Sequence, residues 1–328
     1  MKQYDVYGIG NALVDTEYRV YDALLDQAQL PKGSMSLIEA DDRIKLIRLL
    51  EEEHLAVEKS GGGSAANTMV AVSQLGSKAF YSCKVAADST GDFFVKDLSQ
   101  ARVDTNLSDN REQGTTGECI SMVTPDAERT MATCLGITNF LSPDDLNPEA
   151  LRNSSYLYIE GYLVSSTTGF QAALEAQNIA RTSAVPISLT LSDSAMIEHF
   201  KANYDQLISR GVDLLFCNHD EARLLTGAES VKDCIAALKD ICKTFVMTCG
   251  KDGSVAFDGQ DLSTAAAIPT TAVDTTGAGD VFAGVFLHCL CKGLGFSEAN
   301  ELASKFASKL VSRFGSRLTQ EEVDALLK

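Results

Sequence analysis

The stretch AVDTTGAGDVFAGVFLH, residues 272–288, joins a glycine-rich turn to an apolar helix. Behind the turn, apolar residues recur at helical spacing and Gly293 follows the last of them, so we expect a helix that begins near Gly277. The N–H groups of Gly277, Ala278 and Gly279 would then lie at the positive end of the helix dipole without helical acceptors. The stretch therefore predicts an anion hole.

Asp280 directly follows these three donors. A carboxylate is a poor ligand for an anion, but it could take a proton from a hydroxyl group that attacks phosphorus. Glycines at 277 and 279 would let a phosphoryl group approach the backbone. The simpler interpretation is an aspartate that only stabilises a helix dipole. Because the turn would supply an anion hole and a base together, we favour a catalytic role for Asp280.

The sequence GGGSAANT, residues 61–68, is a second glycine-rich turn. We expect a helix after it from Ser64 to Leu75, with Gly76 past its end. The glycines would allow a ligand to approach the backbone, and Asn67 offers a donor and an acceptor to hydroxyl groups. From this stretch alone, a flexible turn with a buried asparagine is the alternative.

A third turn, TCGKDGSVAF at residues 248–257, follows an apolar segment. It is not a P-loop, because Lys251 is followed by Asp252 instead of Ser or Thr. Its N–H groups or the Thr248 hydroxyl could face a phosphate, although a β-turn alone is the simpler interpretation.

Short apolar segments alternate with helical stretches along the chain of 328 residues. This alternation predicts βαβ units, a mostly parallel sheet and helices on both of its faces, which is an α/β fold. Residues 104–133 break the rhythm with two extended segments around the turn TPDAE, and residues 14–38 contain extended pieces without a long helix. These two regions could form a small sheet that acts as a lid. The candidate strands of the main sheet are Tyr4–Ile9, Lys78–Val85, Tyr156–Gly161, Pro186–Leu191, Val212–Cys217 and Thr244–Thr248.

Charge and cysteine content narrow the partners and the compartment. The chain has 28 Lys and Arg against 45 Asp and Glu, a net charge of −17, which repels nucleic acid and anionic membranes. Its nine cysteines include no Cys-x-x-Cys pair, so we expect reduced thiols. The N-terminus has no signal-peptide pattern, and no apolar run reaches the ~20 residues that span a bilayer. The sequence thus predicts a cytoplasmic protein.

GGGSAANT and DTTGAGD, in this order and at this distance, resemble the two signatures of the PfkB (ribokinase-like) carbohydrate and nucleoside kinases. The resemblance covers essentially the whole chain, and GNALVD, KGSMSLIE and ISLTLSDSAMIEHF are more similar to adenosine kinases than to ribokinase. It implies a single kinase unit over residues 1–328, folded as a three-layer α/β/α sandwich with a Rossmann-like sheet. The small β-sheet lid would comprise about residues 12–40 and 104–135.

The resemblance also implies a role for each motif. Asp280 would be the catalytic base beside the anion hole, and Asp15 would grip two vicinal sugar hydroxyls. The reaction would move the γ-phosphate of ATP to the ribose 5′-hydroxyl of a nucleoside such as adenosine, with a free sugar as the alternative acceptor. Glu221 would help to position Mg²⁺ through water. The implied acceptor residues are Asn11, Asp15, Gly62, Gly63 and Asn67, and the implied nucleotide residues are Asn218, Glu221, Thr248, Gly250, Gly253 and Ser304.

The sequence says less about the contacts with the nucleobase of the acceptor and with the purine of ATP. Tyr18, Phe140 and Tyr162 are candidates to stack on the base of a nucleoside, but no aromatic pair is identified. Many relatives carry Asn or His where Ser304 stands, so the contacts of this chain with the ATP purine depart from the family pattern. Strict preference for ATP is correspondingly open.

Ion dependence, oligomeric state and two other classes of function stay open. Asp274 and Thr276 match positions that help to hold a monovalent cation in some relatives, which suggests K⁺ dependence. The family contains both monomers and homodimers joined through lid sheets. A dehydrogenase is disfavoured, because Leu13 stands where the GxGxxG fingerprint needs a small residue. A non-catalytic nucleoside-binding protein on the same fold is disfavoured by the intact Asp280.

Overall fold

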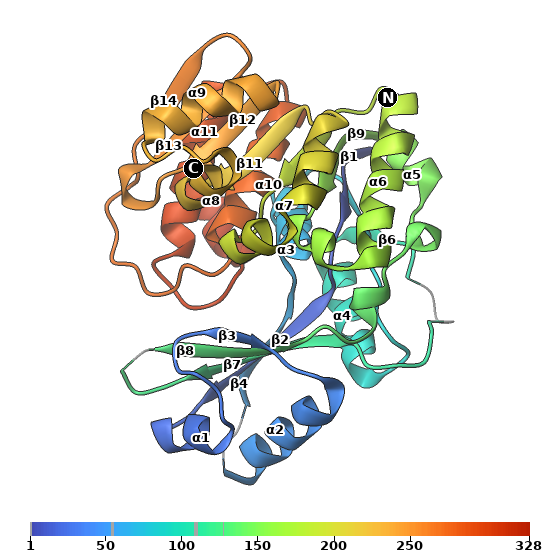
Figure 1. Cartoon of the computed structure of the whole chain (residues 1–328), viewed down its shortest axis with the longest axis vertical. Helices are drawn as coiled ribbons and strands as arrows, with labels where there is room; N and C mark the ends of the chain where they lie inside the picture. Colours follow the sequence, from blue (N-terminus) through green and yellow to red (C-terminus); the bar gives the residue numbers. More distant parts are fainter. Residues whose placement is uncertain (1, 54–55, 108–110, 127) are drawn as a thin grey trace.

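The computed structural model describes residues 2–53, 56–107, 111–126 and 128–328, and within them the chain forms two sheets (Figure 1). The larger sheet has nine described strands. They are parallel except for the strand Ser254–Phe257, which is antiparallel to both of its neighbours. In spatial order they are β14 (Leu262–Ala265), β13 (Ser254–Phe257), β12 (Thr244–Thr248), β11 (Leu214–Asn218), β10 (Ile187–Thr190), β9 (Ser154–Ile159), β1 (Tyr4–Ile9), β5 (Ala79–Ser82) and β6 (Val103–Thr105). The predicted α/β class is confirmed.

Helices cover both faces of this sheet and complete the predicted three layers. Successive side chains of β1 point to opposite faces of the sheet, and this is why two cores form. Tyr7 packs into one hydrophobic cluster and Val6 into the other. The cluster around Tyr7 includes residues of α5 (Pro148–Arg152), α6 (Thr167–Thr182), α7 (Ser194–Ser209), α8 (His219–Thr226) and α9 (Val231–Ile241). The cluster around Val6 includes residues of α3 (Ser64–Gln74), α4 (Ser89–Gln100), α10 (Ala278–Cys291), α11 (Phe296–Leu310) and α12 (Gln320–Leu326).

Helix α10 is the central helix of the second cluster. It is apolar on most of its circumference, because it packs between α3, α11 and the sheet. Gly284 permits the contact with α3, since a Cβ at this position would stand 2.7 Å from the carbonyl oxygen of Thr68. This close packing fixes the N-terminus of α10 beside the N-terminus of α3.

The smaller sheet projects from the main body (Figure 1). Its described strands are, in spatial order, β3 (Met35–Leu37), β8 (Arg129–Cys134), β7 (Gly117–Val123), β2 (Leu13–Arg19) and β4 (Ala56–Gly62). Helices α1 (Asp22–Gln27) and α2 (Ala40–Glu53) cover its outer face, with Leu25 and Leu50 buried between helices and sheet. Arg43 of α2 also forms an ion pair with the buried Glu118 of β7.

The boundaries of this sheet differ from the predicted lid. The hairpin of β7 and β8 is antiparallel as expected, but β4 and most of α2 lie beyond residue 40. Strand β4 reaches the sheet by pairing with β2, which a reading of local pattern did not reveal. Ala127 in the turn TPDAE, and residues 108–110 of the predicted lid range, lie outside the described residues.

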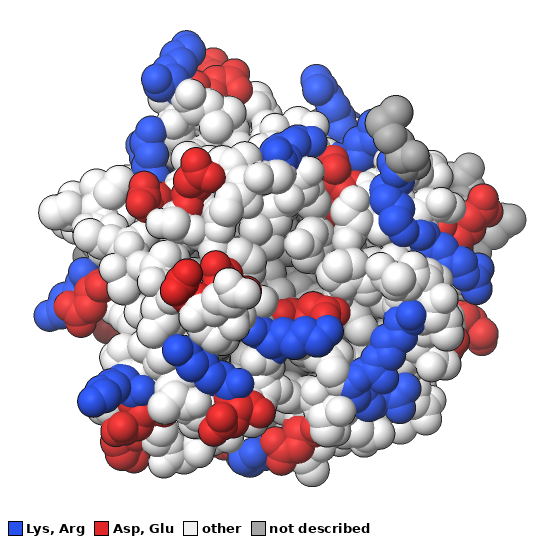
Figure 2. Space-filling view, turned by 90° about the horizontal axis from the view of Figure 1, so that it is seen from above, with Lys and Arg blue, Asp and Glu red and all other residues white. Residues whose placement is uncertain are grey.

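The surface carries charge of both signs. On the face that Figure 2 shows, Lys and Arg side chains are interspersed with Asp and Glu, without one continuous basic tract. Among the described helices, none combines the length and the apolar character needed to cross a membrane.

Candidate active site

A cavity of about 2000 Å³ lies between the smaller sheet and the carboxyl ends of the parallel strands. It collects residues from all three glycine-rich turns, which are far apart in sequence. The predicted site residues that line it are Asn11, Asp15, Gly63, Asn67, Asn218, Glu221, Thr248, Gly250, Thr276, Gly277, Ala278, Gly279 and Asp280. Four predicted residues are absent from its lining, namely Gly62, Gly253, Asp274 and Ser304.

Asp280 lies in the first turn of α10 and contacts the N-terminus of α3. Its Oδ1 accepts a hydrogen bond from Ser64 Oγ at 2.6 Å, and its Oδ2 accepts one from Asn67 Nδ2 at 3.0 Å. Burial raises the pKa of Asp280, while these two hydrogen bonds and the charge of Arg317 oppose the rise. The two hydrogen bonds thus hold the carboxylate in one orientation, and Asp280 is part of the cavity lining.

The N-terminus of α10 differs in detail from the predicted anion hole. Gly277 has φ +78°, and a Cβ there would overlap the backbone of Ser316, so this glycine is required by the fold itself. Gly279 faces open space and leaves room for a ligand. The Ala278 N–H donates to the carbonyl oxygen of Thr275 at 3.2 Å, because the turn before the helix is tight. One of the three expected donors is therefore engaged in this conformation.

The three glycines of the GGG turn have three different neighbours. A Cβ at Gly61 would overlap Asp97, one at Gly62 would overlap the Asp15 carboxylate, and Gly63, with φ +94°, lies against the backbone of residue 11. The turn therefore threads between charged side chains that a larger residue would displace. Gly62 supports Asp15 from behind instead of lining the cavity.

Asp15 extends from β2 of the smaller sheet into the cavity. Burial raises the pKa of Asp15 to about 6, against the opposing charges of Arg317 and Arg129. Asp280 and Asp274 repel it and add to the rise. The hydroxyl groups of a ligand would donate strong hydrogen bonds to such a carboxylate and stabilise its charged form.

Glu160 is a cavity residue that the sequence analysis missed. It follows β9 and is almost fully buried, and its carboxylate accepts hydrogen bonds from the N–H groups of Asn11 (3.1 Å) and Ala65 (2.8 Å). Burial raises the pKa of Glu160 to about 7, although both N–H groups lower it. The signal that could have found it is a lone glutamate at the end of an apolar strand, SYLYIEG.

Asn218 and Glu221 form a capping box at the N-terminus of α8. The Glu221 N–H donates to Asn218 Oδ1 at 2.8 Å, and the Glu221 carboxylate accepts from the N–H and Nδ2 of Asn218 at 2.9 and 2.8 Å. Burial raises the pKa of Glu221 to about 7. The pair therefore has both a structural role and a position in the cavity lining.

The residues predicted on the nucleotide side are divided by the structure. Thr248, at the end of β12, and Gly250 line the cavity. Gly253 has φ +90°, and a Cβ there would overlap the carbonyl oxygen of Ala265, so it serves the strand pairing beside it. Ser304 is buried on α11 with its hydroxyl 2.9 Å from that of Ser254.

Asp274 and Thr276, the predicted cation positions, already contact an arginine. Arg129 of β8 lies 3.1 Å from the Asp274 carboxylate, 2.9 Å from that of Glu17, and 3.4 Å from the Thr276 hydroxyl. Asp274 also accepts the N–H groups of Thr276 and Gly315. The carboxylate thus has a cationic partner that links the smaller sheet to the main body, and K⁺ dependence stays a prediction.

Apolar and aromatic side chains form part of the cavity wall. Phe140 is 62% exposed, Leu37 61% and Met35 43%, and all three line the cavity together with Tyr162. Tyr18, the third predicted aromatic, is buried between the smaller sheet and its helices, so it does not face the cavity. Alternation along β2 explains this, because Asp15 and Tyr18 point to opposite faces.

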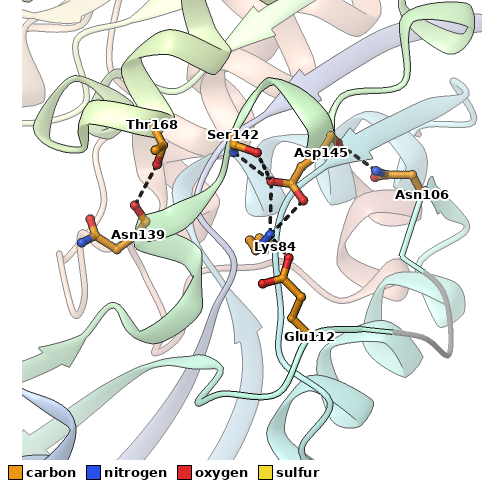
Figure 3. A network of polar contacts seen from close by, with 7 residues as sticks. All are labelled: Lys84, Asn106, Glu112, Asn139, Ser142, Asp145 and Thr168. Atoms are coloured by element: carbon orange, nitrogen blue, oxygen red, sulfur yellow. Dashed lines mark hydrogen bonds and ion pairs between the residues drawn. The ribbon is translucent and has the colours of Figure 1, made fainter.

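Part of the rim is held by the polar network in Figure 3. Lys84, just after β5, contacts Glu112 at 2.6 Å and Asp145 at 3.2 Å. Asp145 also accepts a hydrogen bond from the N–H of Ser142. Since Glu112 lines the cavity on the segment that leads into β7, Lys84 ties this segment to the main body.

Comparisons with known proteins agree with this geometry. The model of the pfkB family of carbohydrate kinases matches residues 35–323. The chain belongs to the PfkB family. This PfkB kinase is 32% identical to a ribokinase from Mus musculus over 238 residues, which are 70% of the chain and 71% of the relative.

Two solved structures extend the likeness of this PfkB kinase over its whole length. A probable sugar kinase from Rhizobium etli CFN 42 has a TM-score of 0.89 at 31% identity, with 100% of this chain and 99% of that chain covered. An adenosine kinase from Sinorhizobium meliloti has a TM-score of 0.88 at 32% identity, with 99% and 100% covered. The predicted family and fold are confirmed, and the activity is that of a sugar or nucleoside kinase.

Proposed function

We propose that this PfkB kinase transfers the γ-phosphate of ATP to the 5′-hydroxyl of a nucleoside such as adenosine. The apolar wall of Phe140, Leu37, Met35 and Tyr162 is the observation that carries the nucleoside assignment. Exposed aromatic and aliphatic side chains in a cleft favour a flat, apolar group, and a heteroaromatic base supplies one whereas a free sugar does not. The likeness to the Sinorhizobium meliloti adenosine kinase supports the same acceptor.

The charged residues fit the remaining parts of such an acceptor. Asp15 would accept hydrogen bonds from the vicinal ribose hydroxyls, and Asn11 and Asn67 lie around the same part of the cavity. Asp280 would take the proton of the attacking hydroxyl. The free N-terminal side of α10 at Gly279 would stabilise the negative charge on the transferred group.

The donor side fits a nucleotide with Mg²⁺. Magnesium is usually bound in proteins by one or two carboxylates together with waters and phosphate oxygens, and Glu221 with Asn218 offers such a partial ligand set at the cavity wall. Bound there, the ion would neutralise charge on the phosphates. Thr248 and Gly250 would contact the nucleotide from the end of β12, while the buried Ser304 supports no direct purine contact.

An ADP-release assay tests the proposal. Purified protein with Mg-ATP, with and without K⁺, is offered adenosine, inosine, guanosine, ribose and fructose, and ³¹P NMR identifies the hydroxyl that is phosphorylated. We expect turnover with a nucleoside at its 5′ position. Turnover with free sugars only would support the alternative of a sugar kinase, which the likeness to mouse ribokinase favours. No turnover with any acceptor would support a non-catalytic binding protein.

Asp280→Asn is the matching test of the base. It preserves the shape of the side chain and should bind substrates normally while kcat falls by about 10²–10⁴, the usual contribution of a general base. Asp240→Asn on the exposed side of α9 is the control and should keep wild-type kcat. If Asp280→Asn kept most of the activity, Asp280 would not be the base.

A further inference from the structure

The segment Gly315–Arg317, between α11 and α12, touches three parts of the site with successive residues. Its first N–H donates to Asp274 Oδ2 at 3.1 Å. Its middle residue lies against Gly277, where any Cβ would overlap. Arg317 Nε then donates to Asn67 Oδ1 at 2.8 Å. The segment therefore supports the turn before α10 and the N-terminal turn of α3 at once.

A continuous chain of hydrogen bonds runs from Arg317 to Asp280. Asn67 accepts from Arg317 through Oδ1 and donates to Asp280 through Nδ2. On the other side, Arg317 Nη1 donates to Asp97 of α4 at 2.6 Å, which anchors the guanidinium. Rotating the amide would place its oxygen against the Asp280 carboxylate and its NH₂ group against the guanidinium. Arg317 thus fixes which atom of Asn67 faces Asp280.

The burial of Arg317 indicates a role beyond holding the neighbouring segments together. Its side chain is 14% exposed, and Nη2 is buried without a hydrogen-bond partner among the described residues. A Cβ at Gly61 would overlap Asp97 Oδ2 and stand 3.1 Å from Nη2, so the ion pair of Asp97 with Arg317 accounts for the glycine that the predicted substrate site did not use. A buried charge with an unsatisfied donor adds little to stability, so stability alone does not explain it.

We propose that Arg317 is a positioning residue for phosphoryl transfer, which acts through Asn67 to hold the Asp280 carboxylate in its reactive orientation and state of charge. The inference deepens the proposed function, because it rests on Asp280 as the base. Arg317 does not itself line the cavity, so it acts through Asn67 instead of touching the acceptor.

The charges around Asp280 explain why a cation is needed there. Asp280 lies among acidic and phenolic groups from several elements, and Arg317 is the cation whose charge lowers its pKa against burial. The groups that face Asp280 or interact with its charge are Ser64 and Asn67 of α3, Asp15 of β2, Tyr158 of β9, Glu160 and Tyr162 after β9, and Arg317. A base must be ionised to accept a proton, so loss of the guanidinium would weaken it most at low pH.

Two variants separate the charge of Arg317 from its hydrogen-bond geometry. Arg317→Gln removes the charge, and Arg317→Lys keeps it without the planar fork that holds Asn67. Arg313→Gln is the control, because Arg313 lies in the same connection between α11 and α12 but pairs with Glu322 of α12. The first readout is the titration of Asp280 by ¹³C carboxyl NMR in the unliganded protein, where the resonance that is lost in Asp280→Asn identifies this carboxyl. The second readout is the dependence of kcat and KM on pH.

We expect Arg317→Gln to raise the pKa of Asp280 and to lower kcat at least tenfold on the acid side of the pH profile, where each unit by which the pKa rises corresponds to a tenfold change. The KM for the acceptor should change much less. Arg317→Lys should titrate like the wild type yet lose kcat, and Arg313→Gln should match the wild type in both readouts.

The inference is overturned if Asp280 titrates alike in Arg317→Gln and Arg313→Gln and kcat is equal in both. Should Arg317→Gln fail to fold, an unchanged kcat in Arg317→Lys overturns it instead. The NMR titration needs no substrate. A wild-type protein that turns over no acceptor would therefore contradict the proposed function, while the titration still decides the role of Arg317.

Discussion

Asp15 is the carboxylate that the smaller sheet contributes to the cavity, and its role can be separated from that of Asp280. Hydrogen bonds to a charged group contribute about 1.5–3 kcal/mol each. Asp15→Asn should therefore raise the KM of the acceptor at least tenfold and leave the KM of ATP within about twofold. Initial rates with each substrate varied in turn measure both values. Equal increases would place Asp15 outside the acceptor site, and Asp26→Asn on α1 is the control.

Glu221 makes stability depend on pH in a direction opposite to that of most carboxylates. Its pKa of about 7 in the folded protein lies above the ~4.3 of an unfolded glutamate, so the folded state binds the proton more tightly. Its contribution to stability is complete below pH 4 and is lost as the pH rises through 7. Gln at this position keeps the capping contact without ionising.

We therefore expect Glu221→Gln to flatten the fall in the free energy of unfolding between pH 5 and pH 8, by on the order of 2 kcal/mol. Urea denaturation of the unliganded protein at the two pH values measures the difference. Glu301→Gln, at an exposed position of α11, should keep the full pH dependence of the wild type. An equal pH dependence in Glu221→Gln and Glu301→Gln would mean that Glu221 ionises freely in the folded state.

The site residues that could be predicted from the sequence are those that lie in or next to an unusual local pattern. Asp280 and Asn67 lie near the start of helices that directly follow glycine-rich turns, and the structure brings them within hydrogen-bond distance. Glu160 and Arg317 have ordinary sequence neighbours, and what makes them part of the site is burial and contacts with distant segments. Such contacts leave no periodicity to read, so only the folded chain shows them.

At the level of elements, helix α2 is what stabilises the outer face of the smaller sheet. Leu50 is fully buried against the sheet, whereas Ile44 on the same helix is 43% exposed. Leu50→Ala should lower the stability of this region by about 2–5 kcal/mol, the usual cost of emptying a buried leucine site, and Ile44→Ala should cost far less. Hydrogen exchange of β2 and β7 measures the local effect. Similar exchange rates in both variants would show that α2 is not firmly seated.

The elements also show where pattern reading succeeds and fails. Strands β1 and β12 were predicted at their observed bounds, because short apolar runs between turns are typical of buried parallel strands. Strand β4, with the sequence AVEKSGG, contains lysine and two glycines and pairs only because β2 offers an edge. For α2, the helical spacing of Leu46 and Leu50 was available in the sequence and was overlooked.

For the whole molecule, the covered outer face of the smaller sheet bears on oligomeric state. In homodimers joined through lid sheets, this surface has to be free to meet a second copy. Here α1 and α2 occupy it with a hydrophobic cluster of their own. We expect a monomer in solution, which light scattering after size exclusion measures. A stable dimer would have to use another surface, and substituting exposed residues of α2 would not dissociate it.

The contact of Arg317 with Asn67 also bears on how the protein is made. Asp15 and Asn67 leave the ribosome early, and Arg317 only after nearly all the other residues discussed here. Domains made in this order commonly collapse before they are complete. The hydrogen bonds that join Arg317, Asn67 and Asp280 can therefore form only after residues 67–317 have all been synthesised.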